Sequence, residues 1–342
     1  MMMPLLLAAC ATTPPADKPV KPIVSMPPAE LPAVPTQDEL TLRSIVLLQD
    51  RLYRVAAPLL VNNADLCKAH ARPLLGFSAR NRYSYASAYQ PAARKVLRLG
   101  DKLQVMDVLG GSGAAKAGVR SGDVLLSIDN TPFPEGEQAE RQTAAVLAPL
   151  VNGRSAVSLT VQRNGRDAML HVPLTYACAF GMELGNTDNV VAFSDGYRIL
   201  VSRGMLQFAA TDDELAYVLA REMAHNVLFP RKGPTAGAAV GSLIDNLTRV
   251  HPDLNMMNST GAMTPMPQKL DVQADRLAVY LLARAGYNLD GIVPFSRRIA
   301  QPPAARYGYG VMHPVTPYRI AAMERAVKEI RAKQARGTTL LP

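Results

Sequence analysis

The residues most able to perform chemistry form the short run Arg221-Glu-Met-Ala-His225. Two histidines four residues apart on a helix can bind zinc from one face, and a glutamate between them can activate water. This run keeps the glutamate, Glu222, and the second histidine, His225. Arg221 stands where the first histidine would be, and a guanidinium cannot donate a lone pair to a metal. By itself the run is weak evidence of zinc chemistry.

A helix should carry this run. Thr211 and Glu214 have the spacing of a capping box, in which the hydroxyl and the carboxylate close the first turn of a helix. Apolar residues follow at helical spacing. They are Leu215, Val218, Leu219, Met223 and Val227. Glu222 and His225 are therefore expected to lie on one helix, three residues apart.

Segments on both sides of the run make the pattern more specific. They are residues 189–196, 198–205, 271–287 and the His313-Pro-Val-Thr-Pro-Tyr-Arg319 segment. In this order, over about residues 181–330, they resemble the HtpX/Oma-type gluzincin metallopeptidases, with a degenerate zinc motif. The resemblance implies a mainly helical zincin-like domain with a small sheet.

The resemblance also implies roles for single residues. Glu222 and His313 match catalytic positions, and His225 and Asp271 match zinc ligands, with aspartate in place of the family's glutamate. Asp275 and Arg319 match residues that support the site. The edge strand that would accept a substrate peptide matches Asn189, Ala192, Phe193 and Ser194.

Two of the ligand positions depart from the family, at Arg221 and at Asp271. Zinc catalysis usually needs three protein ligands, so zinc is the cofactor implied but is expected to be absent. A buried acid without its metal needs a partner, and Arg221 could pair with Asp271 or Glu222 in the metal's place. Two alternatives stay open. In one, Arg221 points to solvent; in the other, zinc is held by His225 and Asp271 with either His313 or His251.

A second module is expected upstream. The run Gly113-Ala-Ala-Lys-Ala-Gly-Val-Arg-Ser-Gly122 and the strand-like Val124–Ile128 after it resemble the core of bacterial PDZ domains. Gly118 and Gly122 stand where turns need freedom in φ. Asn164-Gly165, between two alternating runs, predicts a hairpin turn.

PDZ domains bind an extended peptide by adding it as a strand to a sheet edge. The nearest candidate for their carboxylate-binding loop is Leu99-Gly100-Asp101. The alternative is a PDZ-shaped spacer that binds nothing.

The chain start resembles a lipoprotein signal, because Leu7-Ala8-Ala9 precedes Cys10 as in a lipobox. The n-region lacks basic residues and the apolar core is short, which departs from a secretory signal. Cys67 and Cys178 are favoured as a disulfide in an oxidising compartment, with two free thiols as the alternative. Lipidation of Cys10, with Ala11 next, implies a periplasmic protein anchored to the outer membrane.

These patterns predict an α+β chain in four parts. Residues 1–36 are the signal and a Pro-rich tether, and 37–92 an N-terminal helical part that includes one helix over 38–62. Residues 93–175 are an inserted PDZ-like β-sandwich, and 176–342 the zincin-like domain. The net charge of +9 comes from scattered Lys and Arg residues, with a mild cluster in the last helix, so no nucleic-acid partner is expected.

Three functions remain in view. The first is a pseudopeptidase that binds unfolded or extended polypeptides of the cell envelope, and the second is an active zinc metalloendopeptidase in envelope quality control. The third is a structural lipoprotein whose cleft is covered by the Gly-, Ala- and Met-rich segment 232–268. The altered ligands favour the first.

Overall fold

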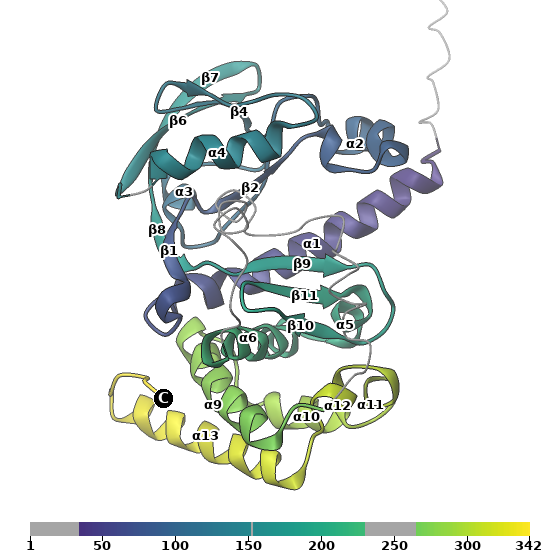
Figure 1. The fold of residues 1–342 in the computed structure, drawn as a ribbon, viewed down its shortest axis with the longest axis vertical. Helices are drawn as coiled ribbons and strands as arrows, with labels where there is room; N and C mark the ends of the chain where they lie inside the picture. Colours follow the sequence, from purple (N-terminus) through teal and green to yellow (C-terminus); the bar gives the residue numbers. More distant parts are fainter. Residues whose placement is uncertain (1–33, 152, 230–264) are drawn as a thin grey trace, which may run out of the picture. The chain divides into compact units, whose positions relative to one another are not determined.

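The computed structural model describes residues 34–151, 153–229 and 265–342. The chain divides into two compact units, Met1–Pro35 and Thr36–Pro342, and the second carries every element described below (Figure 1). The predicted lipidation site Cys10, the Pro-rich tether up to residue 33, His251 and most of segment 232–268 lie outside the described residues. No helix in the described ranges is long and apolar enough to cross a membrane.

The first helix, α1 (Gln37–Val61), covers the segment expected to be helical. Thr36 caps it, because its hydroxyl oxygen accepts a hydrogen bond from the amide of Glu39 at 3.3 Å. The buried side of its C-terminal half carries Leu52, Val55 and Leu59 into the main hydrophobic core. This core is shared with α6 (Asp212–Leu228) and α9 (Gln268–Ala285), so α1 belongs to the same packed body as the C-terminal part of the chain.

A six-stranded sheet forms the PDZ-like unit, which we define as residues 77–173. In chain order its strands are β2 (Phe77–Arg80), β3 (Gln104–Val108), β4 (Val124–Ile128), β5 (Thr131–Pro132), β6 (Ala156–Arg163) and β7 (Arg166–Pro173). The spatial order is β2-β3-β4-β6-β7, with β5 paired to β4. Helix α3 (Gly113–Ala117) lies against β7, and α4 (Ala139–Val151) against β6 (Figure 1).

Local sequence explains several of these elements. Asn164 and Gly165 have φ of 51° and 74°, the two positive values that a type I′ turn needs between β6 and β7. Gly118, at φ 81°, ends α3 in the left-handed region. Leu147 and Val151 on α4 meet Leu125, Leu159 and other strand residues in a separate core under the sheet.

The PDZ-like sheet begins earlier than expected from the sequence. Because β2 pairs with β3, the sheet starts at Phe77 rather than near residue 93. The insert between the two strands contains η2 (Arg82–Ser84), η3 (Ser87–Tyr89) and α2 (Gln90–Leu97). It packs on α1 through a small core that includes Leu42, Tyr85 and Leu99. Because this insert separates β2 from β3 in the chain, the sequence pattern did not reveal β2 as the first strand of the sheet. The predicted β-sandwich is also wrong, since the unit has one sheet covered by helices.

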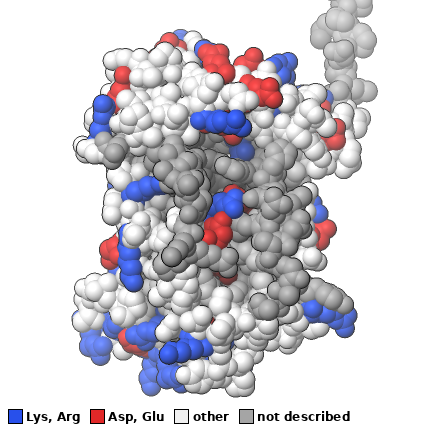
Figure 2. Space-filling view, in the orientation of Figure 1, with Lys and Arg blue, Asp and Glu red and all other residues white. Residues whose placement is uncertain are grey.

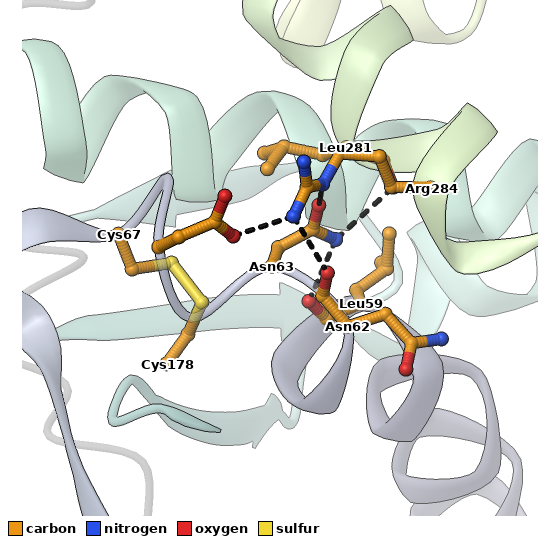
Figure 3. The surroundings of a disulfide bond; sticks show 8 residues. Leu59, Asn62, Asn63, Cys67, Cys178, Leu281 and Arg284 are labelled. Carbon is orange, nitrogen blue, oxygen red and sulfur yellow. Dashed lines mark hydrogen bonds and ion pairs between the residues drawn. A yellow bond between two sulfur atoms is a disulfide. The ribbon is translucent and has the colours of Figure 1, made fainter. Parts of the chain in front are cut away.

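The PDZ-like unit is joined to the rest of the chain by a two-stranded stem, β1 (Ala71–Leu74) and β8 (Thr175–Cys178). The strands are antiparallel, with Ala71 opposite Cys178 and Leu74 opposite Thr175. A disulfide between Cys67 and Cys178, the pair favoured by the sequence, closes the base of the stem (Figure 3).

The base of the stem is also tied to α9. Asn63, fully buried, donates to the carbonyls of Leu59 and Leu281 at 2.9 and 3.1 Å. Arg284 donates from Nε to Oδ1 of Asn63 at 3.1 Å, and Figure 3 shows these side chains beside the disulfide. The PDZ-like unit is therefore an insertion whose entry and exit are fixed to each other and to the helical core.

The remaining elements build the helical part and its small sheet. The strands are β9 (Gly181–Gly185), β10 (Ala192–Ser194) and β11 (Arg198–Ser202), in spatial order β10-β11-β9. The further helices are η1 (Lys68–His70), α5 (Arg203–Phe208), α10 (Ile292–Ile299), α11 (Ala304–Tyr307), α12 (Tyr309–Met312) and α13 (Pro317–Ala335). Helices α6 and α13 pack on α9 (Figure 1).

Charges are mixed on the surface. Figure 2 shows Lys and Arg side chains interspersed with Asp and Glu over the visible face, with Lys and Arg gathering toward its lower end. The charged residues coloured in this view form no continuous basic stripe of the kind that nucleic-acid binding uses.

Candidate functional site

A buried polar centre lies where α6, α9, α12 and α13 meet. Helix α6 begins at its predicted cap, because the hydroxyl of Thr211 accepts from the amide of Glu214 at 3.2 Å and the Glu214 carboxylate accepts from Ala210. This start places Arg221, Glu222 and His225 in the interior. The partners Asp271, Asp275, His313, Tyr309 and Arg319 are also buried.

Arg221 is fully buried and is neutralised by two aspartates of α9. Its Nε donates to Oδ1 of Asp275 at 2.9 Å, and its Nη2 donates to Oδ1 of Asp271. Its Nη1 donates to the hydroxyl of Tyr309 at 2.8 Å. Burial opposes ionisation of Asp275, but the charges of Arg221 and Arg319 outweigh it and lower the pKa of that carboxyl. The predicted ion pair with Asp271 is present, and Arg221 does not point to solvent.

Arg319 provides a second positive charge beside Asp275. Its Nε donates to Oδ2 of Asp275 at 2.8 Å and its Nη1 to the carbonyl of His313 at 2.9 Å. Nη1 also lies 3.3 Å from Oδ2 of Asp271, a charge contact without the alignment of a hydrogen bond. Two guanidinium and two carboxylate groups thus link α6, α9 and α13 in one cluster.

Glu222 has a partner on each oxygen. Tyr309 donates to Oε1 and Ser194 donates to Oε2, both at 2.8 Å. Burial raises the pKa of Glu222, while the charge of Arg221 and these hydrogen bonds act in the opposite direction. The carboxylate predicted to be a general base is therefore held as a hydrogen-bond acceptor between β10 and α12.

The two histidines of the centre are held neutral. Burial, then the charges of Arg221 and His313, lower the pKa of His225 to about 2. Burial and the charges of Arg221 and Arg319 also place the pKa of His313 well below its ordinary value. Nδ1 of His313 lies 2.9 Å from Oδ1 of Asp271, whereas both ring nitrogens of His225 have no hydrogen-bond partner in the described part of the chain.

The predicted zinc ligands do not fit a zinc ion. Oδ1 of Asp271 already accepts from Arg221 and contacts His313, and Oδ2 lies 3.3 Å from Nη1 of Arg319, so each carboxylate oxygen faces a guanidinium charge that would oppose a dication. Ligand atoms of Glu222, His225 and His313 do lie within 4.8 Å of one another. Nη1 of Arg221, however, is 3.8 Å from Oε1 of Glu222, and its charge would repel a dication there.

The edge strand expected over residues 189–194 is shorter in the structure. Strand β10 includes Ala192, Phe193 and Ser194 but not Asn189. The backbone before β10 is already engaged, because the carbonyl of Asn189 accepts from the Ser202 hydroxyl at 2.6 Å. The carbonyl of Val190 accepts from the amide of Tyr309 at 2.7 Å.

A second edge lies in the PDZ-like unit, at β2. This strand ends the spatial order of the six-stranded sheet, and its four side chains are all buried. The loop before it, Leu75-Gly76, turns through Gly76 at φ 84°. The Gly76 carbonyl accepts from the amide of Leu109 at 2.8 Å and from the Ser112 hydroxyl at 3.3 Å. Within the described residues, the amides of Leu75 and Gly76 donate to no acceptor.

The segment expected to be the carboxylate-binding loop does not lie at this edge. Leu99-Gly100-Asp101 leads into β3, which lies inside the sheet, and Leu99 is buried against α1. A glycine after two leucines, followed by a short β-like run, was the available signal for Leu75-Gly76. The predicted domain boundary near residue 93 left it outside the PDZ-like unit.

Comparisons with known proteins give partial matches. No family model matches the chain. A putative serine protease HhoA from Synechocystis sp. is 38% identical over 68 residues, which is 18% of this chain and 17% of that protein. The HtrA3 PDZ domain bound to a phage-derived ligand is 16% identical with a TM-score of 0.24, covering 31% of this chain and 87% of that domain.

A further solved structure, the HtrA-type protease AlgW with a decapeptide, is 23% identical with a TM-score of 0.24 and covers 31% of this chain and 30% of that one. The chain thus spans about a sixth of the length of its curated relative. The fold described above is mixed helix and sheet with a PDZ-like region.

These findings correct the family assignment. The curated match is to a putative serine protease and not to a metallopeptidase, so the predicted HtpX/Oma-type gluzincin family is wrong. The zincin-like peptidase domain is not supported. The metallopeptidase, zinc-enzyme and pseudopeptidase interpretations that depended on it are withdrawn.

A serine-protease site is not visible in the described residues either. Nucleophilic serine catalysis needs a serine hydroxyl hydrogen-bonded to a histidine that acts as base. Ser194 is the serine of the buried centre, and its hydroxyl donates to Glu222 instead. None of the hydrogen bonds of the described serines goes to a histidine ring, so the relative's activity is not transferred to this chain.

Proposed function

We propose that this protein binds an extended polypeptide at the β2 edge of its PDZ-like unit. One observation carries the proposal. Among the described residues, the backbone amides of Leu75 and Gly76 have no hydrogen-bond acceptor, and they lie directly before an edge strand. Successive backbone N–H groups at a turn form a site for an anion such as a peptide carboxylate. A strand added to β2 would receive main-chain hydrogen bonds.

The geometry favours β2 over the other end of the sheet. Strand β7 also ends the spatial order, but its side chains are mostly exposed and it follows the tight Asn164-Gly165 turn. The buried side chains of β2, by contrast, hold its backbone in one position, which lowers the entropic cost of adding a strand.

The location in the cell is part of the proposal. The disulfide Cys67–Cys178 supports an oxidising compartment, and Cys10 remains the predicted point of lipid attachment in the periplasm. The ligands would then be unfolded or extended polypeptides of the cell envelope. Mass spectrometry of the protein from the periplasmic membrane fraction, showing a diacylglycerol adduct on Cys10, would support this location.

The buried Arg221 centre has a structural role in this proposal. It links three helices by ion pairs. Among its described side chains, the atoms without a hydrogen-bond partner are the ring nitrogens of His225 and Oδ2 of Asp271, and the latter faces Arg319 at 3.3 Å.

The binding test uses fluorescein-labelled ten-residue peptides that end in an apolar residue, with fluorescence anisotropy as the readout. The peptide with a free C-terminal carboxylate should bind roughly tenfold more tightly than the same peptide with a C-terminal amide. This ratio corresponds to about 1.4 kcal/mol of binding free energy. N-methylation at the backbone positions that face β2 should abolish binding, whereas N-methylation at the alternate positions should not. Equal affinity for all four peptides would contradict strand addition at β2.

A further inference from the structure

Helix α13 has one buried side and one exposed side. The buried side carries Met323, Ala326 and Ile330 into the main hydrophobic core, against α9 and α10. Cations dominate the exposed side and the neighbouring part of α10. They are Arg297, Arg325, Lys328, Arg331 and Arg336. Figure 2 shows Lys and Arg side chains gathered at the lower end of the visible face, where Figure 1 shows α13.

Acidic side chains neutralise this surface only in part. Arg297 lies 3.6 Å from Glu324, and Arg331 pairs with Asp290, but all four side chains are more than half exposed. Exposed ion pairs of this kind contribute little free energy, so both arginines can turn to another anion. The cations that form no ion pair within the described residues are Arg325, Lys328 and Arg336.

The start of α13 adds apolar contact area to this basic surface. A surface groove of about 440 Å³ between α10 and α13 is lined in part by Val315 and Ile320. Tyr318, in the first turn of the same helix, is 57% exposed. Further along the helix, the exposed side chains of Ala332 and Ala335 are small, so the longer basic side chains around them can reach one plane. Basic and apolar side chains on one exposed helix face are the combination that binds the interface of an anionic membrane.

We infer that the exposed face of α13, together with Arg297 of α10, binds the surface of a membrane that contains anionic phospholipid. The lipid phosphates would accept charge-assisted hydrogen bonds from the guanidinium and ammonium groups. An acidic polypeptide would also neutralise the cations, but the exposed ring of Tyr318 and the apolar groove beside it favour a bilayer interface. The inference depends neither on peptide binding at β2 nor on lipid attachment at Cys10.

Vesicle flotation tests this with the full chain carrying Cys10→Ser, which removes the predicted lipid attachment. The protein should bind vesicles of equal parts phosphatidylglycerol and phosphatidylcholine at low salt, and rising salt should release it. Vesicles of phosphatidylcholine alone should bind it at least roughly tenfold more weakly. Arg325→Gln with Lys328→Gln should weaken binding to the anionic vesicles roughly 25-fold, because each cation near such a surface accounts for about fivefold.

Two further variants separate this surface from net charge. Arg120→Gln with Arg141→Gln removes the same charge from exposed positions of the PDZ-like unit and should leave binding within about twofold. Arg325→Lys with Lys328→Arg keeps both charges on α13 and should bind as well as the unaltered surface. Equal binding to the two kinds of vesicle, or equal losses in the two glutamine pairs, would overturn the inference. Binding to soluble polyglutamate without binding to the anionic vesicles would identify an acidic polypeptide as the partner and would also overturn it.

Discussion

Nε of Arg221 lies 2.9 Å from Oδ1 of Asp275, and both side chains are almost completely buried. This contact joins α6 to α9 at the place where the sequence pattern predicted a metal site. Removal of one member of a buried pair leaves an uncompensated charge, which costs more than the pair itself contributes. The stability of the helical part should therefore depend strongly on Arg221.

Replacement of Arg221 by methionine tests this dependence. We expect Arg221→Met to lower the free energy of unfolding by about 3–5 kcal/mol, because Asp271 and Asp275 lose a buried counter-charge. The matched control is Arg276→Met, which breaks the half-exposed pair with Glu329 and should cost about 0–1 kcal/mol. Urea unfolding followed by circular dichroism measures both, and equal losses would show that the buried pair is not a principal link.

Metal content is the second prediction. Protein purified without added metal should contain no stoichiometric zinc by plasma mass spectrometry. Asp271 is occupied by Arg221, and the guanidinium would stand beside any ion near Glu222. A chelator should leave the unfolding midpoint unchanged. One zinc per chain, released by the chelator with a loss of stability, would contradict this account of the centre.

The amino-acid sequence predicted local structure well where the signals were short-range. Helix α1, the Thr211 cap, strand β4 and the Asn164-Gly165 turn all depend on neighbouring residues, and the structure has each of them. The partners of Arg221 were predicted in part. Asp271 was expected, but Asp275 and Tyr309 were not, because their positions depend on how α9 and α12 pack.

The family and the start of the PDZ-like sheet were wrong for a different reason. The gluzincin assignment used ordered motifs in a helical region, and such motifs can recur without a common chemistry. Strand β2 was missed because the insert with α2 separates it from β3, while their pairing is a long-range feature. Neither result could be obtained from spacing alone.

The disulfide gives a third prediction. Reduction, or Cys67→Ser with Cys178→Ser, should lower the free energy of unfolding by about 2–5 kcal/mol, since the bond closes a loop with a sequence separation of 111 residues. The double variant should no longer respond to reductant, which provides the control. Two free thiols in the untreated protein by mass spectrometry would refute the pairing.

A pair of glycine variants tests the loop before β2. Gly76→Ala combines a φ of 84° with a Cβ 2.6 Å from Cβ of Ser112, so it should destabilise the protein by about 2–4 kcal/mol. Gly118→Ala has a similar φ of 81° and open space, so only the conformational cost of about 1 kcal/mol is expected. Thermal unfolding compares them, and a Gly76 variant as stable as the Gly118 variant would show that the loop is not held against Ser112.

The most direct test of peptide binding at β2 is hydrogen exchange of the full chain with and without a saturating C-terminal peptide. Several strands end a sheet among the described residues, including β2 and β7 in the six-stranded sheet and β10 and β9 in the three-stranded one. We predict protection of the amides at Leu75, Gly76 and β2, with β7 and β10 unchanged. Protection at β10 or β7 instead, or no protection at β2 under saturating peptide, would contradict the proposed binding site.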